Sequence, residues 1–280
     1  MVETFEFRLA EEAAAAILGD DVGQRLGPGG LARVVRLAGP GPTWDALRAA
    51  EGEARKQGRT VLTYWDVRRE YTPAELSAAS LLQLLPTTMF EPSAEETGTV
   101  YDYSQACPIC GAGRRQVSEL ILDLRKAPRK ADFAFTIARD ENIVSKRLAE
   151  MVQLNALTGA RFRSVRPLEP MGDQQRWLQL AFESAALETA SPTKFGMNPL
   201  IGPEPRTCPP GHVAGQRILT ELFIDRRSWD GSDWNRTNDL VGARRGLVAP
   251  YPLIVVSQRC WTLLRQKGFT GFDVEVAHVV

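Results

Sequence analysis

Histidine and cysteine are scarce in this sequence. Its 280 residues include two histidines and four cysteines, which constrains any mechanism that needs several histidines. A chain of this length buries enough apolar surface to form a hydrophobic core. It therefore does not need disulfides to remain folded.

The sequence also lacks a net charge and a long hydrophobic run. Its 34 Lys and Arg cancel its 34 Asp and Glu, so no net field attracts the phosphates of nucleic acid or the headgroups of anionic lipid. Nucleic acid is therefore an unfavourable partner. The apolar runs are shorter than the ~20 residues that span a bilayer, and the N-terminus lacks the basic start of a secretory signal. We expect a soluble, cytoplasmic protein without a membrane partner.

Residues 1–100 are predicted to form an α+β segment that ends in a linker. Phe5–Leu9 alternates apolar and polar side chains, and Thr60–Val67 is rich in β-branched and aromatic residues, so both are predicted strands. Between them, Trp44–Gln57 is predicted to be a helix with Thr43 as its N-cap.

A second helix is predicted to begin at Thr72. Pro73 suits the first turn, and Glu75 completes a capping box. Its apolar face would run to Leu85, with Pro86 ending the helix. Residues 89–99, which contain several acids, are expected to be a linker or long loop.

Residues 101–280 show internal similarity of the kind that a duplication leaves. Gly113–Arg125 aligns without gaps with Gly215–Arg227, with six identities in thirteen positions. Further on, Val144–Arg147 aligns with Val256–Arg259. The pairs Thr158-Gly159 and Thr270-Gly271 follow at the same spacing.

Each half is predicted to contain a strand, a helix and a final strand. The helices begin at the N-caps Ser145 and Ser257, and the last strands are 162–165 and 272–276. The fold class is therefore predicted as α+β, with an N-terminal segment over 1–100 and a duplicated zinc-knuckle module over 101–280. The repeats span about 107–166 and 208–277.

Each repeat opens on a pair of metal-ligating side chains. Cys107 and Cys110 begin the first, and Cys208 and His212 begin the second, with proline inside each turn. Together they make a Cys3His set, which is a closed tetrahedral shell for structural zinc. A redox dithiol at Cys107 and Cys110, or ordinary burial, are the alternatives. Nucleobase deamination is disfavoured because its H-x-E motif precedes the cysteine pair, whereas His212 follows it.

The second repeat is longer than the first by a loop within residues 228–250. This loop combines tryptophan, acidic and arginine side chains, which are typical of protein–protein hot spots. It could equally be a turn that packs on its own core, and its two aspartates could be read as a hydrolase pair. The candidate partner-binding residues are Trp229, Asp230, Asp233, Trp234 and Arg236. The fourth cysteine, Cys260, is expected to be a core residue.

These motifs resemble those of the bacterial double-CxxCG family. The first knuckle Cys107-Pro108-Ile109-Cys110-Gly111, the segment from Pro252 to Arg259 and the closing Thr270-Gly271-Phe272 carry the resemblance, together with a Gly-Pro-Leu-like loop at 193–200. The resemblance covers 105–125 and 190–280. The second CxxCG is replaced by Cys208-x3-His212. Some members of this family are thought to be immunity proteins that neutralise a toxin.

The resemblance and the motifs lead to two functional hypotheses. The first is a non-enzymatic immunity-type protein that binds a cognate bacterial toxin and contains one structural zinc ion. The second is a hydrolase or nucleic-acid-modifying enzyme, whose site would lie between the N-terminal segment and the repeats. No convincing catalytic set is present in the sequence, so the first hypothesis leads.

Overall fold

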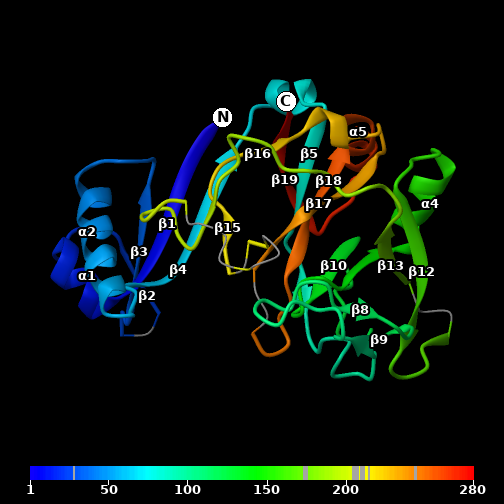
Figure 1. The fold of residues 1–280 in the computed structure, drawn as a ribbon, viewed down its shortest axis with the longest axis horizontal. Helices are drawn as coiled ribbons and strands as arrows, with labels where there is room; N and C mark the ends of the chain where they lie inside the picture. Colours follow the sequence, from blue (N-terminus) through cyan, green and yellow to red (C-terminus); the bar gives the residue numbers. More distant parts are fainter. Residues whose placement is uncertain (28, 173–175, 204–207, 209–211, 214, 243–244) are drawn as a thin grey trace.

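The computed structural model has an N-terminal lobe beside a larger body (Figure 1). We define the N-terminal lobe as residues 1–70 and the body as residues 71–280. The described residues are 1–27, 29–172, 176–203, 208, 212–213, 215–242 and 245–280. Pro209, Pro210 and Gly211 of the second predicted knuckle lie outside them. The α+β class is confirmed.

The N-terminal lobe is an antiparallel sheet with two helices. Its strands pair in the order β2-β3-β1-β4, and the rings of Phe5 and Phe7 meet the Trp44 ring edge-on at 4.9 and 5.5 Å. The two predicted strands and the predicted helix correspond to β1, β4 and α2, although Gly41 rather than Thr43 is the N-cap. The elements are β1 (Val2–Ala10), α1 (Glu11–Leu18), β2 (Gln24–Leu26), β3 (Ala32–Leu37), α2 (Pro42–Lys56) and β4 (Leu62–Glu70).

The second predicted helix is only partly correct. The capping box of Thr72 and Glu75 is present, but α3 (Pro73–Ala78) ends early and Leu81–Pro86 is a strand, β5. Leu81 and Leu82 are both fully buried, in two different apolar clusters. A short apolar run buried on both faces is typical of a central strand. Because β5 belongs to the body, the N-terminal unit ends near residue 70 rather than residue 100.

The body contains two large sheets. The outer sheet has the order β6-β10-β11-β13-β12-β9, and the central sheet has the order β17-β18-β5-β19-β16. Two short hairpins, β7–β8 and β14–β15, precede β9 and β16. The elements are β6 (Met89–Phe90), β7 (Tyr101–Asp102), β8 (Arg115–Gln116), β9 (Leu120–Leu122), β10 (Phe133–Thr136), β11 (Asn142–Ser145), α4 (Lys146–Leu154), β12 (Ala160–Pro167), β13 (Trp177–Phe182), β14 (Phe195–Gly196), β15 (Arg217–Ile218), β16 (Leu222–Ile224), the 3-10 helix η2 (Arg226–Ser228), β17 (Trp234–Val241), β18 (Tyr251–Ser257), α5 (Gln258–Gln266) and β19 (Phe272–Val279).

The two sheets of the body have matching strand orders and registers. In the outer sheet, β9 and β12 form a parallel pair at one edge, and in the central sheet β16 and β19 do the same. Apart from β6, all the other strand pairs of both sheets are antiparallel. Ser145 lies opposite Trp177 in the outer sheet, and Ser257 lies opposite Leu81 in the central sheet. The middle strands β13 and β5 therefore occupy equivalent places, although they come from different parts of the chain.

Two buried aspartates hold the helix starts of the body. Ser145 caps α4 and donates to Asp132 at 2.7 Å, whereas Ser257 caps α5 and donates to Asp233 at 2.6 Å. Each aspartate also accepts from a backbone N–H of the other half, that of Thr270 at 3.3 Å for Asp132 and that of Thr158 at 3.0 Å for Asp233. Both predicted serine caps are confirmed, and the aspartates link the two halves.

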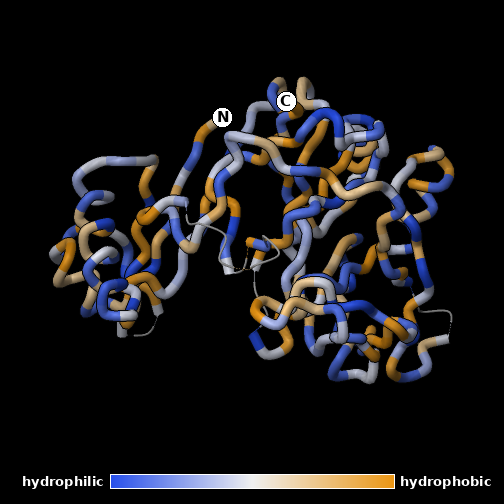
Figure 2. The backbone as a smooth tube through the Cα atoms, in the orientation of Figure 1, coloured by the Kyte–Doolittle hydropathy of each residue, from blue (hydrophilic) through white to orange (hydrophobic). Residues whose placement is uncertain are grey.

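The apolar residues of the body join the two sheets. One cluster includes residues of β5, β10, β11, α4, β13, β17, β18 and α5, so the helices and both sheets share a core. In Figure 2 hydrophobic segments lie in both the N-terminal lobe and the body, and the cluster of the lobe also includes Leu200 and Leu219 of the body. None of the described helices is long and apolar enough to span a membrane.

Gly159 and Gly271 allow the two halves to approach closely. A Cβ at Gly271 would lie 2.1 Å from the carbonyl oxygen of Phe133, and one at Gly159 would lie 2.1 Å from that of Trp234. Both glycines have positive φ, 88° at Gly159 and 104° at Gly271. Any side chain at either position would therefore separate the two sheets.

We expect Gly271→Ala to destabilise the body strongly. The clash with the Phe133 backbone adds to the backbone strain, so the free energy of unfolding should fall by about 3 kcal/mol or more. Gly268→Ala is the matched control, because Gly268 also has positive φ but open space around it. It should cost only about 1 to 2 kcal/mol. Equal losses for the two variants in urea denaturation would contradict this packing.

Candidate metal centre

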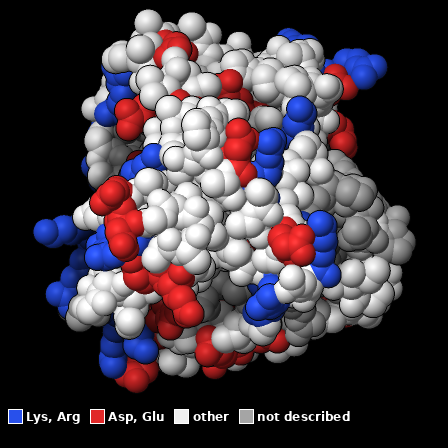
Figure 3. Space-filling view, turned by 90° about the vertical axis from the view of Figure 1, so that its left-hand side faces the viewer, with Lys and Arg blue, Asp and Glu red and all other residues white. Residues whose placement is uncertain are grey.

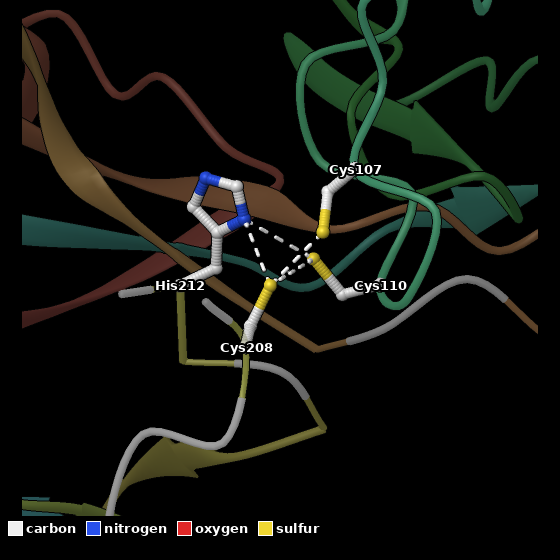
Figure 4. Close-up of side chains that lie close together, drawn as sticks. All are labelled: Cys107, Cys110, Cys208 and His212. Atoms are coloured by element: carbon white, nitrogen blue, oxygen red, sulfur yellow. Dashed lines mark hydrogen bonds between the residues drawn. The ribbon is translucent and has the colours of Figure 1, made fainter. Parts of the chain in front are cut away.

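The four predicted ligands lie together between the two short hairpins of the body. Cys107 and Cys110 occupy the turn between β7 and β8, and Cys208 and His212 occupy the segment between β14 and β15. Figure 4 shows all four side chains directed toward one centre. Their ligand atoms lie within 4.8 Å of one another. The structure therefore confirms a cluster that could hold a metal ion.

The first turn is shaped to present two sulfurs. The Gly111 N–H donates to the Cys107 carbonyl at 2.8 Å, and the Cys107 N–H donates to the Ala112 carbonyl at 2.7 Å. Gly111 has a φ of 75°, a conformation that glycine adopts without a steric cost. These bonds close the tight turn that brings Cys107 and Cys110 to one side.

The distances between ligand atoms suit a small tetrahedral ion. Cys110 Sγ lies 3.9 Å from Cys208 Sγ and 3.4 Å from His212 Nδ1, and Cys208 Sγ lies 3.5 Å from the same nitrogen. Zinc–sulfur bonds of about 2.3 Å and zinc–nitrogen bonds of about 2.0 Å give separations of about 3.5 to 3.8 Å in a tetrahedron. Cys107 and Cys208 are closer, at 2.9 Å. Three of these four separations thus match a shared ion.

Burial and hydrogen bonding set the protonation of the three thiols. The hydrogen bond from Cys208, aided by the backbone N–H of Cys110, lowers the pKa of Cys107 to about 6. Burial raises the pKa of Cys208 to about 12 and also raises that of Cys110. A metal ion binds thiolates. Its binding therefore releases protons from the two thiols that burial keeps neutral.

An ion-paired arginine supports the first hairpin. Arg114 donates to Asp140 at 2.8 Å, and its guanidinium stacks on the Tyr101 ring at 4.1 Å. The Tyr101 hydroxyl in turn donates to Glu141 at 2.7 Å, and burial raises the pKa of Glu141. These contacts fix the hairpin that bears Cys107 and Cys110 against the outer sheet.

The five candidate partner-binding residues do not form one surface, and Trp234 and Arg236 lie on strand β17 rather than in a loop. Trp234 is fully buried and Asp233 is 5% exposed, so neither is available to a partner without rearrangement. Trp229 is half-buried and donates from its indole to the Ser232 carbonyl at 3.0 Å. Asp230 and Arg236 are exposed. For Trp234 and Asp233 the structure favours the interpretation of a turn packed on its own core.

The remaining candidate residues have structural environments. Cys260 is fully buried in the shared core, as expected, and burial raises its pKa strongly. Sequence reasoning did not identify Asp132, which binds the capping serine of the first half as Asp233 does in the second half. It also missed Gln83, a buried glutamine of β5. The tripeptide Leu82-Gln83-Leu84, repeated at Leu178-Gln179-Leu180, is the pattern that would have located it.

Fold and site together describe an α+β protein with a four-ligand Cys3His cluster between two hairpins. A comparison of the sequence with protein-family models and with curated proteins finds no match. The resemblance to the double-CxxCG family therefore rests on the quoted residues alone.

We expect the purified chain to contain about one metal ion, and Cys110→Ser to lose it. Removing one of four ligands leaves a site that water can enter and that binds less tightly. Cys260→Ala is the matched control, because Cys260 belongs to the shared core and not to the buried cluster of Cys107, Cys110 and Cys208. Elemental analysis after dialysis checks both variants. Full metal content in Cys110→Ser would refute the ligand assignment.

Asp233→Ala should destabilise the fold far more than Asp230→Ala. Asp233 accepts from Ser257 and Thr158 and lies 3.6 Å from the Arg259 guanidinium, so its removal leaves buried donors unpaired. We expect a loss of about 3 kcal/mol in urea denaturation. Asp230 is exposed and accepts from Ser232 of the same turn, so its loss should stay below about 1 kcal/mol. A reversed order would contradict the assigned roles.

Proposed function

We propose that this protein is a non-enzymatic, immunity-type protein that binds and neutralises a bacterial toxin, and that its cluster holds a structural zinc ion. The observation that carries this proposal is the ligand set itself. Three thiols and one imidazole nitrogen converge within 4.8 Å, which completes a tetrahedral shell without a position for water. A closed shell stabilises structure and leaves no metal-bound nucleophile.

Zinc is the ion that this ligand set favours. Thiolates are soft ligands, and a tetrahedral site of sulfur with one imidazole is typical of zinc. The ligands come from two hairpins separated by about a hundred residues, because Cys107 lies 101 positions before Cys208. An ion held there would connect parts of the chain that no disulfide joins.

We also propose that residues 81–280 are two copies of one unit that exchange their first strands. The matched sheets support this, as does the tripeptide shared by β5 and β13. Hairpin contacts support it further, since the Ile121 N–H donates to Thr99 and the Phe223 N–H donates to Thr193, each at 2.8 Å. On this view β5 is the first strand of the first copy but pairs with β18 and β19 of the second copy. Likewise, β13 is the first strand of the second copy but pairs with β11 and β12 of the first copy.

One observation supports the enzymatic alternative. That hypothesis places an active site between the N-terminal segment and the repeats, and the structure has a cleft there. The cleft lies between the N-terminal lobe and the body and has a volume of about 880 Å³. Asp230, Asp233 and Arg236 do not line it. Two of its acids are ion-paired, Glu275 with Arg69 at 3.0 Å and Asp66 with Arg217 at 2.9 Å. This composition suits binding better than acid–base catalysis.

The surface charge also fits a protein partner better than nucleic acid. The face of the N-terminal lobe in Figure 3 carries acidic and basic side chains side by side. A nucleic-acid-binding face usually presents a continuous basic stripe instead.

The toxin hypothesis predicts a toxic partner encoded next to this chain. Expressed alone in a bacterial host, the product of the neighbouring reading frame should arrest growth, and co-expression of this chain should restore growth. The two proteins should then co-purify as a complex of fixed stoichiometry. Cys110→Ser should lose protection because the second hairpin is no longer fixed, whereas Cys260→Ala should keep it. A harmless neighbour, or arrest that co-expression does not relieve, would contradict the proposal.

A further inference from the structure

The cleft between the N-terminal lobe and the body has two unlike walls. On one side it is lined by consecutive residues of β4 and its continuation, from Tyr64 to Tyr71. On the other side it is lined by the face of the central sheet that carries Gln83, Leu85 and Glu275. Figure 1 places β4 at the margin of the N-terminal lobe that is nearest the body. The first wall is thus a strand edge and the second a sheet face.

The edge of β4 that faces the cleft is unpaired at its centre. β4 is the last strand of its sheet and pairs with β1 alone. Arg217 donates from the cleft side to the Trp65 carbonyl at 2.7 Å, so the backbone of Trp65 points away from β1. Alternate residues of a strand point the same way. Val67 therefore turns its N–H and C=O to the cleft, where no described residue bonds to them.

Gln83 leaves a buried oxygen without a partner in the same cleft. This residue is 2% exposed, and its Oε1 has no hydrogen bond. The equivalent residue of the outer sheet, Gln179, does have a partner: its Oε1 accepts from Gln116 at 3.5 Å, and its amide donates to Gln116 at 2.6 Å. The alignment of the two halves places Ile218 where Gln116 stands, and Ile218 also lines the cleft. The central sheet thus retains the glutamine but lacks its partner.

An unsatisfied buried carbonyl destabilises the free chain, because the group loses its bonds to water and gains none. A ligand that donates a hydrogen bond to Gln83 would remove this cost. The same ligand must also suit the Val67 edge, which presents a donor and an acceptor side by side. A peptide strand presents the complementary pair.

We propose that this cleft binds an extended peptide segment of the partner protein, which adds as a strand to the free edge of β4 and donates a hydrogen bond to Gln83. The proposal rests on the proposed function in one respect, namely that the chain acts by binding another protein. The edge from Trp65 to Arg69 spans about 14 Å, enough for four or five residues of peptide.

Charge supports recognition through the peptide backbone. The ionisable residues that line the cleft are balanced, since Arg68, Arg69, Arg139 and Arg217 face Asp66, Glu70, Asp273 and Glu275. A balanced cleft selects neither an anionic nor a cationic ligand. Tyr64 and Tyr251, which also line it, can pack against side chains of the bound segment.

A phage-displayed library of random linear peptides is the probe for this site. The library is selected on the full-length, zinc-loaded chain, and the enriched peptides are synthesised and titrated by calorimetry. Val67→Pro removes the central N–H donor at an edge position where proline is tolerated. We expect this variant to weaken binding about tenfold or more, and we expect bound peptide to slow hydrogen exchange of the Val67 amide in the wild type.

Two glutamine variants form a matched pair that does not depend on proline. Gln83→Leu should also weaken binding about tenfold, and it should raise the melting temperature of the free chain because an unpaired carbonyl is removed. Gln179→Leu should leave peptide affinity unchanged and lower the melting temperature, because it breaks the bond with Gln116. A variant that merely damaged the fold would lower the melting temperature instead.

The outcomes separate this proposal from the toxin hypothesis. Failure to enrich peptides, or peptides whose affinity is the same for Val67→Pro, Gln83→Leu and wild type, would overturn the cleft site. If both cleft variants still neutralise the toxin, the toxin hypothesis stands and the cleft site falls. If peptides bind at β4 but the neighbouring gene product is harmless, the cleft site stands and the toxin hypothesis falls.

Discussion

The arrangement of the body depends on one constraint, the convergence of four side chains that could hold a metal ion and that come from two separate hairpins. Cys107 and Cys110 can meet Cys208 and His212 only if the turn after β7 and the segment after β14 lie against each other. The ligand atoms of the two hairpins lie within 4.8 Å of one another, so the two hairpins meet at the cluster. An ion bound there would fix the two hairpins to each other.

Other contacts between the two halves of the body involve protein groups alone. Asp132 and Asp233 each bond to a capping serine of one half and to a backbone N–H of the other. Gly159 and Gly271 remove the side chains that would hold the halves apart. Breaking either contact therefore affects both helices and both sheets, and we infer that the body unfolds as a unit.

The N-terminal lobe is attached by apolar and polar contacts, and Leu200 and Leu219 of the body belong to its apolar cluster. The Trp65 indole donates to the Met197 carbonyl at 2.7 Å, and Asn198 donates to the buried Glu51 at 2.9 Å. Arg69 adds bonds to Glu275 and to the Leu219 carbonyl, each at 3.0 Å. The lobe thus rests on the second hairpin and on one end of the central sheet. The cleft occupies the space that these contacts leave open.

The sequence predicted the features that depend on side-chain chemistry. Cysteine and histidine spacing located the cluster, and serine before an apolar helix located both N-caps. It did not predict β5 or β13, because a short apolar run suits a helix face and a buried strand equally well. It also left two roles open for Asp233 and Trp234, whose burial depends on a strand pairing that spacing does not reveal.

The proposed zinc site requires the four side chains to form a closed shell around one ion. X-ray absorption at the edge of the bound metal in the purified chain measures that shell directly. We expect three sulfur neighbours at about 2.3 Å and one nitrogen at about 2.0 Å, with no further light atom. An oxygen neighbour from water, or fewer than three sulfurs, would contradict it.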